Sequence, residues 1–188
     1  NISQHYIDMT TIVGEMFGAK VSVYKRQGEY GPSTVTSFQS KELAKFLVKE
    51  CGPNSFEKKV PDFIFTSPLE CKAACIQGYM DGDGNINCDK GHHEIRGCSR
   101  SQQLIKDMGL MFNYFDIFVT FLENVRQKKP FYHFAIAHSY ANLYQQHIGS
   151  VLKEDTLREL CEYGNRENAH SLSNDVDKIE GLGEIIAK

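Results

Sequence analysis

The sequence lacks any apolar run of about 18 residues, the length that a helix needs to cross a bilayer. Its N-terminus also lacks the charged and then apolar pattern of a secretory signal. We therefore expect a soluble protein with no membrane partner, inside the cell, in the cytoplasm or nucleus of its host. With 188 residues, 41% of them hydrophobic, the chain can bury one sizeable core.

The sequence also lacks an excess of basic residues. Its formal net charge of −3 argues against a strongly basic nucleic-acid binder. The acidic balance is concentrated in residues 150–188, where nine acidic residues stand against five basic ones, so residues 1–149 are nearly neutral. Local basic clusters, such as Lys58 with Lys59, still permit contacts to phosphate.

Cysteines are few. Six in this length do not make a disulfide scaffold, and we interpret them as reduced thiols that act as small packing residues. Cys88, His92, His93 and Cys98 leave a zinc site as an alternative, although their spacing is not a standard one.

An internal duplication is visible in the chain. The segment Val13–Phe17 is matched by Met108–Phe112, and each lies in a predicted helix that is followed by two strands and another helix. The predicted strands cover residues 20–26 and 33–38 in the first copy and residues 115–121 and 131–137 in the second. A further helix (68–80) and two strands (84–88 and 93–98) precede the second copy only. We therefore expect the first repeat to be incomplete.

The helix at 68–80 has a clear start and an unusual end. Ser67 is expected to cap it, Pro68 suits its first position and Glu70 completes a capping box. Asp81 and Asp83 fall at its C-terminus, where the helix dipole disfavours carboxylates. This placement suggests that a positive group, such as a divalent cation with oxygen ligands, offsets their charge.

The residues Gly78-Tyr79-Met80-Asp81-Gly82-Asp83-Gly84 resemble the core of the LAGLIDADG (dodecapeptide) motif of homing endonucleases. Upstream, Lys58-Lys59-Val60-Pro61 resembles the Lys-x-Ile/Val-Pro block that precedes this motif in intein-borne members. The resemblance implies that Asp83, with the carbonyl of Gly82, holds a catalytic Mg²⁺. It also implies that Lys58 lies beside the scissile phosphate. Lys129 holds a loosely corresponding place in the second repeat.

The resemblance further implies an α+β fold of αββαββα LAGLIDADG repeats with a saddle-shaped antiparallel sheet. Residues 1–50 would be the C-terminal part of the first repeat and residues 51–66 a linker. Residues 67–149 would be the second repeat, and residues 150–188 an acidic helical extension, to which we give no function. The missing part of the first repeat, or a second copy, would pack on the 68–80 helix.

The implied parent is an intein-encoded enzyme that cuts double-stranded DNA by metal-assisted hydrolysis, and strand side chains would bind the DNA groove. The expected DNA-binding residues are Lys20, Ser22, Tyr24, Arg26, Asn85, Asn87 and Arg96. If these form one row, strand alternation directs Val21, Val23, Ile86 and Ile95 into the helical layer.

Three alternatives to a DNA-cutting enzyme remain open. The first is a catalytically inactive relative, the second is an RNA-maturase-like relative and the third is a calcium-binding module. For the calcium module, Asp83, Asn85, Asn87 and Glu94 stand at positions 1, 3, 5 and 12 of a calcium loop, but the required glycine is replaced by Cys88. Protein splicing by this chain alone is not expected, because Asn1 and Lys188 supply neither the nucleophile nor the ending that splicing needs.

Overall fold

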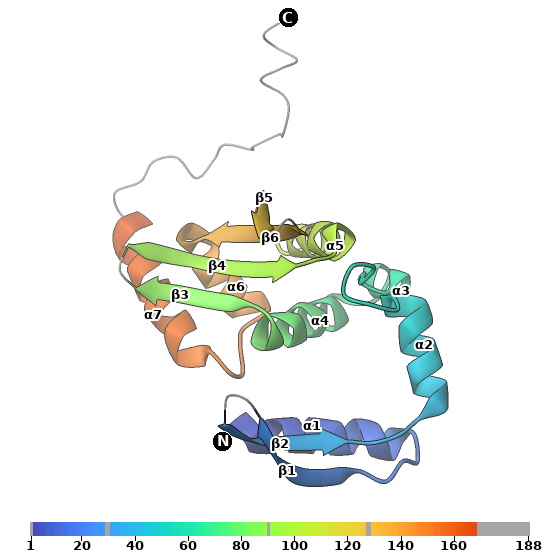
Figure 1. The fold of residues 1–188 in the computed structure, drawn as a ribbon. Coiled ribbons are helices and arrows are strands. Elements are labelled where there is room, and N and C mark those ends of the chain that lie inside the picture. The colour runs from blue at the N-terminus through green and yellow to red at the C-terminus, as the bar shows by residue number, and fades with distance from the viewer. Residues whose placement is uncertain (1, 29–30, 90, 127–128, 169–188) are drawn as a thin grey trace, which may run out of the picture.

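The fold is described from a computed structural model, which covers residues 2–28, 31–89, 91–126 and 129–168 (Figure 1). It contains a small N-terminal unit and a larger unit built on a four-stranded sheet. A single extended connection, which is largely helical, joins the two units (Figure 1). Both sheets are antiparallel and helices pack beside them, so the predicted α+β class is confirmed.

The N-terminal unit consists of α1 (Ile2–Met16) and a hairpin of β1 (Ser22–Gly28) and β2 (Gly31–Ser37). The helix lies close to the hairpin because Gly14 has no side chain. A Cβ at Gly14 would lie 2.5 Å from Cγ2 of Val21. The hydroxyls of Thr10 and Thr36 also lie 2.8 Å apart, in hydrogen-bond contact between α1 and β2.

The hairpin does not extend the larger sheet. Within the described residues, β1 and β2 form a sheet of their own. Val21 nevertheless lies against α1 at Gly14, and Val23 shares that face, because its strand partner Thr36 contacts Thr10 of α1. Both therefore point toward a helix, as predicted, but α1 alone covers them incompletely and Val23 is 50% exposed. The apolar face of α1 is also open, and its exposed side chains are Tyr6, Met9, Ile12 and Met16.

The connection is formed by α2 (Lys41–Cys51), a short loop and α3 (Asp62–Phe65). Ser40 caps α2 by accepting a hydrogen bond from the Leu43 amide at 3.2 Å. None of the residues of α2 is buried.

The larger unit has the strand order β3-β4-β6-β5. Its strands are β3 (Asn85–Asp89), β4 (His92–Ser99), β5 (Thr120–Arg126) and β6 (Lys129–Ala137). Its helices are α4 (Leu69–Gly82), α5 (Gln102–Asn113), α6 (Ala141–His147) and α7 (Glu154–Asn168), with a 3-10 turn η1 (His138–Tyr140) before α6.

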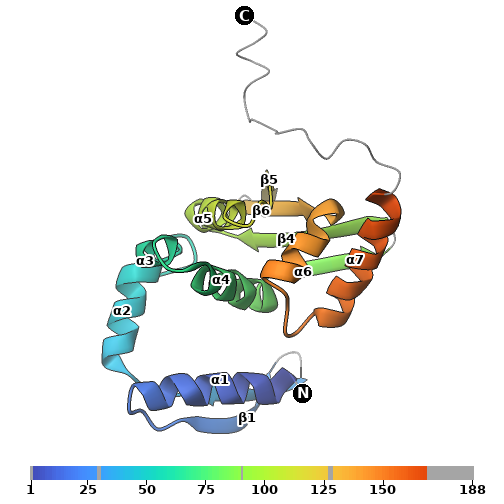
Figure 2. The same ribbon diagram turned by 180° about the vertical axis from the view of Figure 1, so that it is seen from behind.

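The helices back one face of this sheet, as Figure 2 shows from behind. Side chains from that face and from α4, α5 and α7 form the core, among them Ile76, Met108, Ile95, Phe134 and Leu160. Because α7 supplies buried Leu157, Leu160 and Cys161, the acidic segment is part of the core. No helix within the described ranges is long and apolar enough for a membrane span.

Two local predictions differ from the structure. The strand expected at 115–121 starts only at Thr120, because the chain turns after α5 through Asp116, which has a φ of 57°. Phe115 and Ile117 are buried in that irregular segment, so the alternation is real but does not belong to a strand. Ser67 does not cap α4; Pro68 is the N-cap residue, and the Ser67 hydroxyl donates to the Phe63 carbonyl at 2.7 Å.

Candidate functional site

The C-terminus of α4 carries the acid that the sequence singled out. Asp83 is the C-cap residue, and its amide donates to the Tyr79 carbonyl at 2.8 Å. Its carboxylate is exposed and accepts no hydrogen bond from the described residues. Gly84 then lets the chain turn tightly into β3, since a Cβ there would lie 2.5 Å from the Met80 side chain and 2.7 Å from its carbonyl oxygen.

Asp81 has a different role from Asp83. Its carboxylate accepts hydrogen bonds from the Ser150 hydroxyl, from the Val151 amide at 3.0 Å and from the Leu152 amide at 3.5 Å. Asp81 therefore binds the segment that leads into α7, and its oxygens are engaged there.

A positive group does lie at this helix end, and it is a lysine that the sequence analysis missed. The ammonium of Lys153 donates to the carbonyls of Met80 at 2.5 Å, Asp81 at 2.9 Å and Gly84 at 2.8 Å. Burial lowers the pKa of Lys153, while the charges of Asp81 and Asp83 act in the opposite direction. No local pattern could have revealed Lys153, because its partners lie about 70 residues earlier in the chain.

The oxygens at this site suit a hard divalent cation. Asp83 offers an open carboxylate, and the carbonyl of Gly82 is not among those that Lys153 binds. Mg²⁺ is commonly held by one or two carboxylates, with waters and substrate phosphate completing its shell. Within the described ranges, no three His, Cys, Asp or Glu side chains cluster as metal ligands. The site thus provides one acid and needs further ligands from elsewhere.

Tyr79 fixes α4 to the sheet. Its hydroxyl donates to the Cys98 carbonyl of β4 at 2.9 Å. Burial strongly raises the pKa of Tyr79, so the phenol remains protonated and continues to donate.

Lys58 approaches the same region through its backbone. Its carbonyl accepts a hydrogen bond from the Ser101 hydroxyl at the start of α5. The side chain of Lys58 is exposed. Because Tyr79 contacts Cys98 and Lys58 contacts Ser101, both approach the junction of β4 and α5. No ion pair joins Lys58 to Asp83 in the described part of the chain.

The expected DNA-binding residues of the larger sheet lie together. Asn85 and Arg96 are directly paired across β3 and β4. Their neighbours Ile86 and Ile95, which point to the other face, are 6% and 0% exposed, so the predicted alternation is confirmed. Arg96 makes an ion pair of 2.6 Å with Glu94, and Glu94 is paired with Asn87.

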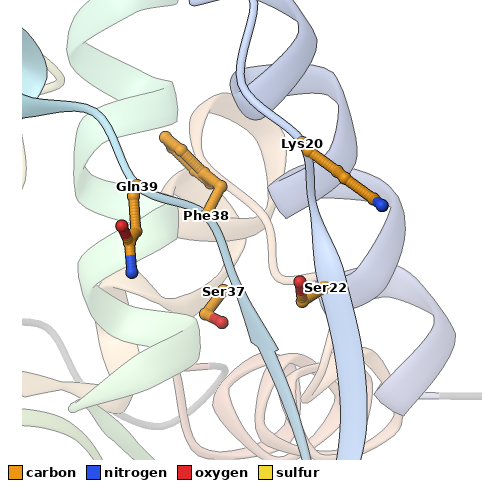
Figure 3. Close-up of a pocket in the computed structure, with 5 residues that line it drawn as sticks. All are labelled: Lys20, Ser22, Ser37, Phe38 and Gln39. Carbon is orange, nitrogen blue, oxygen red and sulfur yellow. The ribbon is translucent and has the colours of Figure 1, made fainter.

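The remaining four candidates lie in the other sheet. Lys20, Ser22, Tyr24 and Arg26 belong to β1 or to the turn before it, and all are exposed. The single continuous row of DNA-facing side chains expected from the sequence is therefore divided between two sheets. A shallow hollow lies at the base of the hairpin, where Ser22 and Ser37 are paired, with Lys20 and Gln39 nearby (Figure 3).

The two alternative metal sites are not formed. In β3 and β4, Cys88 pairs with His93 in the hairpin register, and the His93 ring stacks on Tyr163 with centroids 3.5 Å apart. No zinc cluster arises there in the part of the chain that the structure describes. The calcium loop is also contradicted, because its positions form a β-hairpin and the strand β4 stands where a second helix is required.

Lys129 is the first residue of β6, paired with Arg126, but its side chain lies outside the described ones. The expectation of a further element near residue 179 likewise falls outside the described residues.

Comparisons with known proteins agree with this architecture. Residues 70–159, just under half of the chain, match the LAGLIDADG-like domain family. Solved structures of the homing endonuclease I-DmoI are similar in fold. One, in complex with DNA and Mn, has a TM-score of 0.59 and 15% identity, over 79% of this chain and 74% of that one. Other I-DmoI structures were determined with Mg or Ca.

Sequence relatives are parts of much larger proteins. The RNA polymerase subunit Rpo1C of Methanocaldococcus jannaschii is 26% identical over the whole of this chain but only 21% of its own length. A DNA polymerase of Thermococcus kodakarensis is 33% identical over 34% of this chain and 4% of its own length. Elongation factor 2 of Methanopyrus kandleri is 34% identical over 31% of this chain and 4% of its own length. The chain therefore spans about a fifth of the first relative and far less of the others.

Proposed function

We propose that the chain is part of a homing endonuclease that binds and cleaves double-stranded DNA, because its residues 70–159 match the LAGLIDADG-like domain family. The observation that carries this proposal is the exposed carboxylate of Asp83 at the end of α4, beside the hairpin of β3 and β4. A structural acid would be expected to have partners of its own, as Asp81 has.

In this proposal Asp83 and the Gly82 carbonyl hold a divalent cation, Mg²⁺ in the cell. Such a cation, once bound, polarises a phosphate and helps to generate the attacking water. The protein's own contribution is to keep the carboxylate open to solvent at a fixed helix end. Lys58, and Lys129 in the second repeat, are proposed to favour the charge that develops on the phosphate.

The exposed face of β3 and β4 is proposed to bind the DNA groove. Asn85, Asn87 and Arg96 project from it, and a two-stranded ribbon fits the major groove of B-DNA. The exposed hairpin residues Lys20, Ser22, Tyr24 and Arg26 are proposed to form a second DNA contact. The nearly neutral charge of residues 1–149 fits recognition by a few placed groups more than broad electrostatic attraction.

The relatives support the view that this element is encoded within an intein. An RNA polymerase subunit, DNA polymerases and an elongation factor have little function in common, yet each matches this chain over only a small part of its own length. A mobile segment carried by different hosts accounts for that pattern more simply than common descent of the hosts. We propose that such a parent also splices, through residues that this chain does not supply.

The chain carries one motif acid, whereas cutting both strands needs two. The missing partner is proposed to be the rest of the first repeat or a second copy. Gly78 on α4 has open space around it, so another helix can approach closely there. The open apolar face of α1 would be covered in the same assembly.

Selection of duplexes from a random library tests this function. Ca²⁺ would be present during selection, so that binding occurs without cleavage. The selected duplex would then be incubated with Mg²⁺ and either the wild-type chain or Asp83→Asn. Specific binding with nicking that Asp83→Asn abolishes supports the proposal. Specific binding without any nicking favours the inactive relative, and preference for RNA favours the maturase.

A further inference from the structure

The segment between α6 and α7 lies beside the end of α4 (Figures 1 and 2). It is folded as a tight turn, since the Lys153 amide donates to the Ser150 hydroxyl at 2.9 Å. This turn brings the Lys153 ammonium within hydrogen-bond distance of three carbonyls at the C-terminus of α4.

The contact between the two segments is reciprocal. The backbone and hydroxyl groups of residues 150–152 donate to the Asp81 side chain, while the Lys153 side chain donates to the backbone of α4. One segment thus satisfies both a carboxylate and the terminal carbonyls, which otherwise lack partners within the helix.

Charge explains why a lysine suits this position. The last carbonyls of a helix form the negative end of its dipole, and Asp81 and Asp83 add to that charge. An ammonium with three donors can bind three converging carbonyls, which a neutral side chain cannot do.

The three carbonyls belong to Met80, Asp81 and Gly84, so they flank Asp83 on both sides. The Asp83 carboxylate accepts no hydrogen bond from the described residues, so its direction depends on the backbone that carries it. Two glycines, Gly82 and Gly84, adjoin it and would make that backbone flexible without an external restraint.

We propose that Lys153 is a positioning residue for Asp83, which fixes the Met80–Gly84 turn and thereby strengthens divalent-cation binding at the Asp83 carboxylate. This inference rests on the proposed function, in which Asp83 is the metal-binding acid. It assigns a role to a residue that lies 72 positions after Asp81 of the motif.

The test uses the full chain and three variants. Lys153→Met removes the charge and donors but keeps an apolar stem of similar length. Arg158→Met is the matched charge control, because Arg158 is exposed and pairs only with Asp155 among the described residues. Leu157→Ala, at a buried position of the same helix, controls for general destabilisation.

Two quantities are measured: the affinity for Mn²⁺, from the broadening of amide signals, and hydrogen exchange of the amides of Asp81 to Gly84. Lys153→Met is expected to weaken Mn²⁺ binding about tenfold, the usual size of an effect on residues that orient a metal ligand. Lys153→Met should also accelerate hydrogen exchange of the amides of Asp81 to Gly84 by about tenfold or more. Arg158→Met should change neither, and Leu157→Ala should not affect these amides selectively.

Unchanged or higher Mn²⁺ affinity in Lys153→Met, with binding intact in the wild type, overturns the inference. So does selective acceleration of exchange in Leu157→Ala equal to that in Lys153→Met, because the role would then be general stability. Absence of Mn²⁺ binding in the wild type counts against the proposed function itself. In that case the exchange data still decide whether Lys153 fixes the turn.

Discussion

The carboxylate of Asp107 accepts a hydrogen bond from the amide of Val60 at 3.0 Å, across 47 residues of sequence. Its other oxygen accepts from the Gln103 side chain at 2.7 Å. Asp107 and Val60 are both buried, so this bond ties the block that carries Lys58 to the middle of α5. Asp107 therefore controls the position of a segment far from it in sequence.

Asp107→Ala is expected to lower the free energy of unfolding by about 1–3 kcal/mol, because the buried Val60 amide loses its acceptor. Urea denaturation measures this loss. Gln102→Ala, an exposed substitution at the start of α5, serves as control and should change stability by less than about 0.5 kcal/mol. Equal effects of both substitutions would show that the bond contributes nothing specific.

Substitutions of Asp81 and of Asp83 should have different effects, the first on stability and the second on metal binding. Asp81→Ala removes an acceptor for three donors and is expected to cost about 1–2 kcal/mol, as the loss of a cap does. Asp83→Asn should leave the melting temperature nearly unchanged while abolishing Mn²⁺ binding, because its carboxylate has no hydrogen-bonded partner in the described structure. Thermal denaturation and metal titration of both variants check this. Strong destabilisation by Asp83→Asn would instead assign it a structural role.

Two glycines predict opposite responses to alanine. At Gly97 a Cβ would lie 2.3 Å from the buried Phe134 ring, so Gly97→Ala should destabilise the chain by about 1–3 kcal/mol. At Gly78, where space is open within a helix, Gly78→Ala should stabilise the isolated chain by about 0.5–1 kcal/mol.

The same Gly78→Ala variant tests the proposed docking of a second helix on α4. If another helix packs there, the added methyl group should weaken that association while the isolated chain gains stability. Sedimentation equilibrium with the complete parent's first repeat measures this. Unaltered association would place the partner on another face.

Arg96→Ala should weaken binding to a selected duplex and reduce the slope of log affinity against log salt by about 1 if Arg96 contacts one phosphate. Stability should change little, because the ion pair lies at the surface, with 44% of the Arg96 side chain and 23% of the Glu94 side chain exposed. Arg158→Ala, on α7, is the control. An unchanged salt slope together with a lower melting temperature would mean that Arg96 is structural.

The sequence predicted the elements whose signals are local. The helix α5 forms where the apolar spacing around Met108–Phe112 predicts it, and Ile86 and Ile95 alternate with polar neighbours because one face of their strands is buried. The exposure of Val23 could not be predicted in this way, because it depends on which sheet the hairpin joins. The alternation of Phe115 and Ile117 led to the wrong prediction of a strand for a related reason. An irregular segment that crosses a core can also bury every second residue.

Long-range chemistry was harder to predict. Asp83 was found because glycines and a second acid surround it, whereas Lys153 looks like an ordinary residue at the start of an acidic helix. Its role follows only from the turn at Ser150, which brings it to α4. The sequence argument correctly required a positive group at that helix end but proposed only a metal ion for it.

The length of the exposed helix α2 affects the distance and the rotation between the N-terminal unit and the larger unit. An α-helix advances about 1.5 Å and rotates about 100° with each residue, so its length sets both a spacing and an angle. None of the residues of α2 is buried, and its contacts beyond the cap at Ser40 include the ring of Phe63, which lies 6.0 Å from that of Phe46. A one-residue insertion in α2 would rotate the N-terminal hairpin by more than a quarter of a turn around the connection. The number of residues in α2 therefore sets the orientation of the β1–β2 hairpin, and with it the side of a bound duplex that the hairpin could reach.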